Sequence, residues 1–165
     1  PSVVEGQPLG RAGRLSEPLS LAEFTTSLYA ALPPSPGGLR VAGPPDARVE
    51  RVAVMGGAGD DMFDHVRASG ADVYVTADLR HHPVLEAREQ SRGGPPYLVD
   101  AGHWATESLW LAGAADRVRT AVADGGEGAA REATPEQCGH RRHAARKDFR
   151  RLFDRERERG RHTLR

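Results

Sequence analysis

The sequence predicts an α/β protein in which helices flank a layered, largely parallel or mixed sheet. Strand-like and helix-like segments alternate along residues 49–123, and the strand-like segments are continuous apolar runs, which is typical of strands buried on both faces. With 165 residues, of which 38% are hydrophobic, the chain is long enough for one domain with a substantial core. A single cysteine excludes an internal disulfide framework and a cysteine-rich zinc site.

The N-terminal part is expected to contribute one helix and short strand segments. Residues 1–19 are rich in Pro, Gly and Arg, which predicts a strand end followed by a loop. Ser20 and Glu23 form a Ser-x-x-Glu capping box before an apolar-periodic run, so a helix is expected over residues 21–32. Prolines and glycines end this helix, and residues 39–41 are a short strand candidate.

Three strand–helix units follow. Their strands are expected over residues 49–55, 72–76 and 97–100, and their helices over residues 60–70, 83–91 and 104–123. A Gly-rich turn at residues 56–59 and a loop over residues 78–82 connect the first two strands to their helices. Polar residues cluster directly after each strand, in the segments 56–61, 76–82 and 100–107. Because ligands usually bind at the carboxyl ends of parallel strands, we expect the functional site there.

The charge distribution divides the chain into three parts. Residues 1–130 hold 11 Lys/Arg and 17 Asp/Glu, whereas residues 131–165 hold 12 and 6. We therefore expect an α/β body over residues 1–123, a Gly/Glu/Ala-rich linker over residues 124–139, and an Arg-rich tail over residues 140–165 that is helical or disordered. Nucleic acid is a weak candidate partner, and only through this tail.

The hydropathy pattern predicts a cytoplasmic protein without a membrane segment. No apolar run approaches the roughly 18 residues that a membrane helix needs, and no signal peptide opens the chain. The heavy use of Arg, Ala, Gly and Pro with a single lysine is typical of a GC-rich bacterial genome.

His103 and Glu107 are the first candidate metal ligands. A spacing of four places both side chains on one face of a helix, where an imidazole nitrogen and a carboxylate oxygen can converge on one cation. His/Glu pairs at this spacing are common, so spacing alone favours a surface ion pair or a helix cap.

The second group of candidates follows the strand over residues 72–76. At most one of the adjacent His81 and His82 need face a site at the sheet edge, and Asp78 is suited to orient an imidazole; the alternative is a pair of loop histidines. Four polar residues either support metal ligands or bind a polar substrate, or they are caps and loop residues: Thr76, Asp78, Asp100 and Thr106. The Gly-rich turn lacks a dinucleotide or P-loop pattern, so tight strand–helix packing is the preferred interpretation.

Taken in order, these motifs resemble one known family. The segments are residues 8–13 (PLGRAG), 20–24 (SLAEF), 51–59 (RVAVMGGAG), 70–78 (GADVYVTAD), 81–82 (HH) and 100–107 (DAGHWATE). Their succession resembles the NIF-three-like dinuclear metal centre proteins, also called GTP cyclohydrolase 1 type 2 homologues. The resemblance extends over about residues 8–115, and it identifies the chain as the C-terminal portion of such a protein.

The resemblance implies a two-domain α/β protein that forms a toroidal homohexamer and holds two divalent metal ions, such as zinc, iron or manganese, between its domains. It places metal ligands at His103 and Glu107, through the family's Gly-His-x-x-x-Glu motif, and a site-lining histidine at His82. The family's N-terminal half, with a paired-histidine motif and an Asp ligand, has no counterpart in this sequence, and the Arg-rich tail replaces the family's usual C-terminal strand.

The function implied by the resemblance is metal-dependent hydrolysis, with a purine nucleotide such as GTP as the substrate. His82 is our hypothetical proton carrier, because an imidazole titrates near neutral pH. The alternative from another class is a metal-binding scaffold or regulatory interaction protein without turnover. Whether the chain is an enzyme is left open, and without the N-terminal half we expect it to be inactive.

Overall fold

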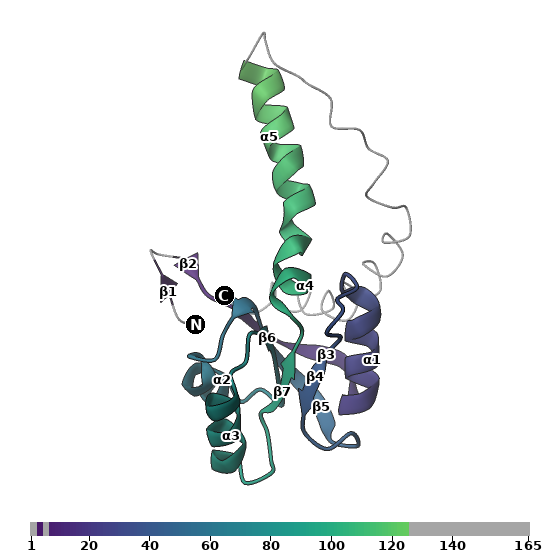
Figure 1. Ribbon diagram of the computed structural model, residues 1–165, viewed down its shortest axis with the longest axis vertical. Coiled ribbons are helices and arrows are strands. Elements are labelled where there is room, and N and C mark those ends of the chain that lie inside the picture. The colour runs from purple at the N-terminus through teal and green to yellow at the C-terminus, as the bar shows by residue number, and fades with distance from the viewer. Residues whose placement is uncertain (1–2, 5–6, 126–165) are drawn as a thin grey trace, which may run out of the picture.

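The computed structural model describes residues 3–4 and 7–125, and within them a five-stranded mixed sheet forms the centre of the fold (Figure 1). Its strands, in spatial order, are β3 (Arg11–Ser20), β5 (Arg48–Ala58), β6 (Val73–Ala77), β7 (Tyr97–Asp100) and β4 (Arg40–Ala42). The three central strands are parallel, and both edge strands pair antiparallel to them. The predicted α/β class with a mixed sheet is confirmed.

Helices cover both faces of this sheet. Helix α1 (Leu21–Ala31) lies on one face, and α2 (Phe63–Ser69) and α3 (His81–Gln90) lie on the other (Figure 1). A hydrophobic core lies on each face of the sheet. Alternate residues of the central strands contribute to the two cores, because successive side chains of a strand point to opposite faces. Val73 packs with Phe24 of α1, whereas Tyr74 packs with Phe63 of α2. Strand β6 is therefore buried along its whole length.

The predicted helix over residues 104–123 is divided into three pieces. Helix α4 (His103–Glu107) is followed by the 3-10 turn η1 (Ser108–Trp110) and then by α5 (Leu111–Gly125), which projects away from the sheet (Figure 1). Apolar side chains remain exposed along these three pieces: Trp104, Leu109, Trp110, Leu111, Val118 and Val122. The helical spacing of apolar residues continues through the 3-10 turn, so the sequence pattern did not indicate the break between α4 and α5.

The loop predicted before residue 20 is wrong. Val3–Val4 (β1) and Gln7–Pro8 (β2) form a small antiparallel ribbon, and Arg11–Ser20 is the edge strand β3. The register between β3 and β5 shifts between Arg14 and Leu19, and Pro18 lies inside this irregular stretch. Proline is tolerated there because an edge strand has one side without ladder hydrogen bonds.

Other boundaries differ by a few residues. Strand β5 continues three residues beyond its predicted end into the Gly-rich segment, α2 begins later than predicted, and α3 begins at His81 rather than at Pro83. The predicted linker begins within α5, and its remainder and the Arg-rich tail lie outside the described residues. Among the described residues, no helix combines the length and the apolar character that crossing a bilayer requires.

Candidate metal site

The candidate site lies where β5, β6 and β7 end. Gly102 follows β7 with a φ of 78°, a left-handed conformation that suits glycine, and this turn leads directly into α4. His103 and Glu107 are the first and last residues of that helix, so their side chains share one face. The predicted meeting of polar segments at this edge is observed, with the segment after β6 contributing Asp78.

His103 has a partner at each ring nitrogen. Its Nε2 lies 3.0 Å from Oε2 of Glu107, and its Nδ1 lies 2.6 Å from Oδ2 of Asp78. About half of each of these three side chains is exposed. Asp78 has a positive φ of 53°, which is uncommon outside glycine and marks a backbone held by its surroundings.

These contacts set the charge and the tautomer of the imidazole. The Asp78 carboxylate at Nδ1 raises the pKa of His103 above its ordinary value of 6.5, and Glu107 adds to the increase. In the neutral ring, Asp78 favours the tautomer with the proton on Nδ1. The lone pair of Nε2 then points toward the Glu107 side, which is the arrangement that a metal-binding histidine needs.

Backbone from β5 approaches this pair closely. Gly57 has a φ of 72°, and a Cβ on it would lie 2.6 Å from Oε1 of Glu107 and 3.3 Å from Nε2 of His103. The carbonyl of Gly57 accepts a hydrogen bond from the buried Thr76 hydroxyl. The Gly-rich segment, for which strand–helix packing is the predicted role, thus also allows backbone to approach the site, and the run of glycines after an apolar strand is the signal for such an approach.

Asp100 lies beside the site and supports it structurally. Its buried carboxylate accepts hydrogen bonds from the backbone N–H groups of Gly102 and Leu79, at 3.1 and 3.2 Å, and from Arg40 at 2.7 Å. These contacts join the turn before α4 to the loop that carries Asp78. Asp100 therefore holds two parts of the site in place and directs its oxygens to the backbone.

His81 and His82 make no described contact with His103 or Glu107. Both are exposed at the start of α3, and their rings contact one another edge to face, with centroids 5.4 Å apart. Among the contacts of the described residues, none joins either ring to His103 or Glu107. The structure thus brings together one histidine and two carboxylates, and leaves the paired histidines outside.

The two candidate ligands do not form a complete metal site by themselves. Within residues 3–4 and 7–125, no group of three or more His, Cys, Asp and Glu side chains is arranged to hold a metal ion. Asp78 lies at the opposite nitrogen of His103, so it orients the ring and does not share a cation with Glu107. A closed zinc site has four ligands, so the pair would be part of a site.

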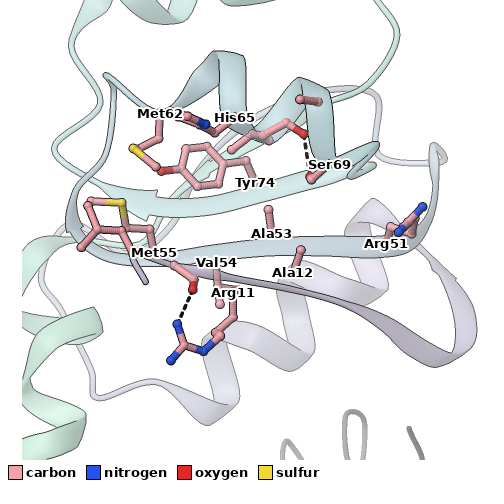
Figure 2. Close-up of a pocket in the computed structure, with 14 residues that line it drawn as sticks. Arg11, Ala12, Arg51, Ala53, Val54, Met55, Met62, His65, Ser69 and Tyr74 are labelled. Atoms are coloured by element: carbon pink, nitrogen blue, oxygen red, sulfur yellow. Dashed lines mark hydrogen bonds between the residues drawn. The ribbon is translucent and has the colours of Figure 1, made fainter. Parts of the chain in front are cut away.

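A separate hollow of about 750 Å³ lies between α2 and the strands β3 and β5 (Figure 2). Ala12 and Ala53 line it from the strands β3 and β5, Tyr74 from β6, and Met62 and His65 from the side of α2. Its lining includes none of the predicted site residues, and it is mostly apolar. We therefore place the candidate metal site at the strand ends, where the converging polar groups lie.

Comparison with known proteins places these observations in context. The sequence model of the family Duf34/NIF3 (NGG1p interacting factor 3) matches residues 2–133. A Streptomyces coelicolor protein named GTP cyclohydrolase 1 type 2 homolog is 52% identical over 111 residues, which are 67% of this chain and 38% of the relative. A Mycobacterium tuberculosis protein of the same name is 50% identical over 115 residues, which are 70% of this chain and 30% of the relative.

Solved structures agree with the sequence comparison. The crystal structure of a Bacillus cereus protein related to NIF3 matches with a TM-score of 0.59 and 29% identity, over 71% of this chain and 30% of the other. A Staphylococcus aureus protein matches with a TM-score of 0.55 and 24% identity, over 70% of this chain and 36% of the other, and supports the fold alone. The chain spans 30–38% of the length of these relatives.

Proposed function

Because this chain belongs to the Duf34/NIF3 family, we propose that it contributes part of a divalent metal centre, with His103 and Glu107 as its ligands. The observation that carries the proposal is the geometry at His103. One ring nitrogen faces Glu107 at 3.0 Å, and the other is held by Asp78 at 2.6 Å. Metal-binding histidines commonly have their second nitrogen fixed by a carboxylate in this way.

The donor set fits a transition metal better than calcium or magnesium. An imidazole and a carboxylate together suit zinc, iron or manganese, whereas calcium and magnesium prefer oxygen ligands alone. The remaining ligands would come from polypeptide outside this chain, since the relatives are longer. We propose that the intact protein binds two such ions and assembles as a homohexamer.

The chemistry we propose is hydrolysis, with a purine nucleotide such as GTP as the substrate. The names of the curated relatives support this choice. A divalent metal supplies hydroxide near neutral pH by lowering the pKa of bound water. In this chain, His103 and Glu107 would hold the ion, Asp78 would keep the imidazole oriented, and His82 is the candidate proton carrier. We place this activity in the cytoplasm.

A non-catalytic metal-binding scaffold is the second candidate. The observation that favours it is the exposure of two large aromatic side chains beside the site, Trp104 at 64% and Trp110 at 62%. Exposed apolar groups that gather in one region often mark contacts with other proteins. Metal-dependent consumption of GTP that is lost in Glu107→Ala would support the enzyme, whereas metal retention without turnover supports the scaffold.

Metal content of the purified chain tests the metal site first. We expect the parent, prepared without a His tag, to retain a transition metal in elemental analysis, and His103→Ala and Glu107→Ala to lose it. His65→Ala is the matched control, because His65 is an exposed histidine on α2 beside the separate hollow. Equal metal retention in the parent and both ligand variants would contradict the assignment of these ligands, whereas a metal-free parent means that the pair needs the ligands from outside this chain.

A further inference from the structure

Strand β5 bulges where it passes the candidate site. It is paired with β6 at Val54–Val75 and again at Ala58–Ala77. Between these two pairs β5 contains residues 55–57, whereas β6 contains Thr76 alone, so the backbone around Gly57 leaves the regular ladder. A bulge bends the strand and redirects its groups, and such features are frequent beside functional sites.

Two threonine hydroxyls form hydrogen bonds with the backbone of Gly57. The hydroxyl of Thr76 donates to the carbonyl of Gly57 at 2.9 Å, and the N–H of Gly57 donates to the hydroxyl of Thr106 at 3.1 Å. Thr76 is completely buried and Gly57 is buried as well. Both backbone groups of the glycine are thus satisfied by side chains from two different elements, β6 and α4.

The contact continues into the helix that carries the proposed ligands. The Thr106 hydroxyl that accepts from Gly57 also lies 2.9 Å from the carbonyl oxygen of His103, to which it donates. The chain of hydrogen bonds runs from β6 through the bulge of β5 to the first residue of α4. It holds Gly57 at the place where a Cβ would touch both His103 and Glu107.

We propose that Thr76 and Thr106 are positioning residues that fix the Gly57 peptide against His103 and Glu107 and so preorganise the metal site. This inference rests on the proposed function for its metal readout. The bulge alone would let the Gly57 peptide move, and a moved peptide would leave room for Glu107 to turn away from His103. The two hydroxyls hold the N–H and the C=O of Gly57, and thus the peptide units on both sides of its Cα.

The test removes each hydroxyl while keeping the side-chain shape. Thr76→Val and Thr106→Val delete the hydrogen bonds, and Thr76→Ser and Thr106→Ser restore the hydroxyl. Thr25→Val is the matched control, since the Thr25 hydroxyl lies within hydrogen-bond distance of the carbonyls three and four residues earlier, as the Thr106 hydroxyl does, but on a helix remote from the site. Zinc chloride titrated into each protein in a calorimeter gives the affinity, and NMR gives the His103 ring and Gly57 amide signals.

We expect zinc affinity to fall about tenfold or more in both valine variants and to stay within about threefold of the parent in the serine variants, as for supporting residues of metal ligands. The His103 and Gly57 signals should move in the valine variants and return toward the parent positions with serine. Thr25→Val should leave both unchanged. Circular dichroism of each variant shows whether it is folded, and the serine variants decide the matter if a valine variant unfolds.

The two proposals fail differently. If the parent binds zinc no better than His103→Ala, the pair does not bind zinc without the rest of the protein, and the NMR signals alone then decide the positioning role. If folded Thr76→Val and Thr106→Val keep the parent's His103 and Gly57 signals, or if the parent binds zinc and they keep its affinity, the positioning role is overturned.

Discussion

The Nδ1 atom of His103 lies 2.6 Å from Oδ2 of Asp78, a residue 25 positions earlier in the chain. The contact joins the loop after β6 to the start of α4, and it fixes which nitrogen of the imidazole faces Glu107. The loop itself is held by Asp100, which bonds the N–H of Leu79. Asp78 therefore orients the proposed ligand His103, and Asp100 holds the loop that carries Asp78.

Replacing Asp78 with Asn should weaken metal binding without unfolding the protein. The amide is neutral, so it holds the Nδ1–H less strongly and no longer increases the basicity of Nε2. We expect zinc affinity to fall about 10- to 100-fold, which calorimetry measures. Asp116→Asn is the control, since Asp116 pairs with Arg119 on the exposed surface of α5. Equal losses in the two variants would contradict an orienting role for Asp78.

Replacing Gly57 with Ala should damage the site and the fold together. The added Cβ would meet Oε1 of Glu107 at 2.6 Å, and rotation of that carboxylate relieves the clash only by moving the proposed ligand. The positive φ adds strain of about 1–3 kcal/mol, which chemical denaturation measures. Gly113→Ala in α5 meets nothing within 4 Å and should instead gain up to about 1 kcal/mol from helix propensity. Retained zinc affinity in Gly57→Ala would argue against the close approach.

Replacing His82 with Ala should leave metal affinity unchanged. The exposed ring contacts His81 and makes no contact with His103 or Glu107 among the described residues. If His82 is the proton carrier, turnover of GTP falls in this variant while elemental analysis shows the parent's metal content. Loss of the metal would instead make His82 a ligand and would revise the site.

The capping box at the start of α1 should make stability depend on pH. Hydrogen bonds from the Ser20 side chain and backbone hold the pKa of Glu23 below its ordinary 4.5. A carboxylate with a lowered pKa in the folded state stabilises the protein above the unfolded-state pKa, and this contribution is lost as the pH falls through the folded-state value.

Thermal unfolding of the parent and Glu23→Gln checks this sign. The parent should be more stable than the variant near neutral pH, and the difference should shrink as the pH falls below 4.5, the ordinary value for this carboxyl. Glu17→Gln is the control, because Glu17 is an exposed residue of β3 outside the cap. A difference that grows on acidification would contradict the assigned role of the Glu23 carboxylate.

Local sequence patterns were sufficient to predict the positions of most helices and strands. The Ser20–Glu23 capping box placed the start of α1 correctly, because both partners lie within one turn of the helix they begin. The apolar runs identified β6 and β7 to within one residue. The same local reasoning failed at β3, whose composition is typical of a loop and which becomes a strand only because β5 offers a partner.

For the site, the sequence by itself placed His103 and Glu107 on one face of a helix, because residues four apart share a face, and the family resemblance named them as candidate ligands. Only the tertiary structure decided that Asp78 bonds His103 and that Gly57 lies against it, and among the described residues it shows no contact from His82 to either. These relationships depend on the order of the strands and on the bulge in β5. Strand order and register are set by packing among distant segments, which no local spacing encodes.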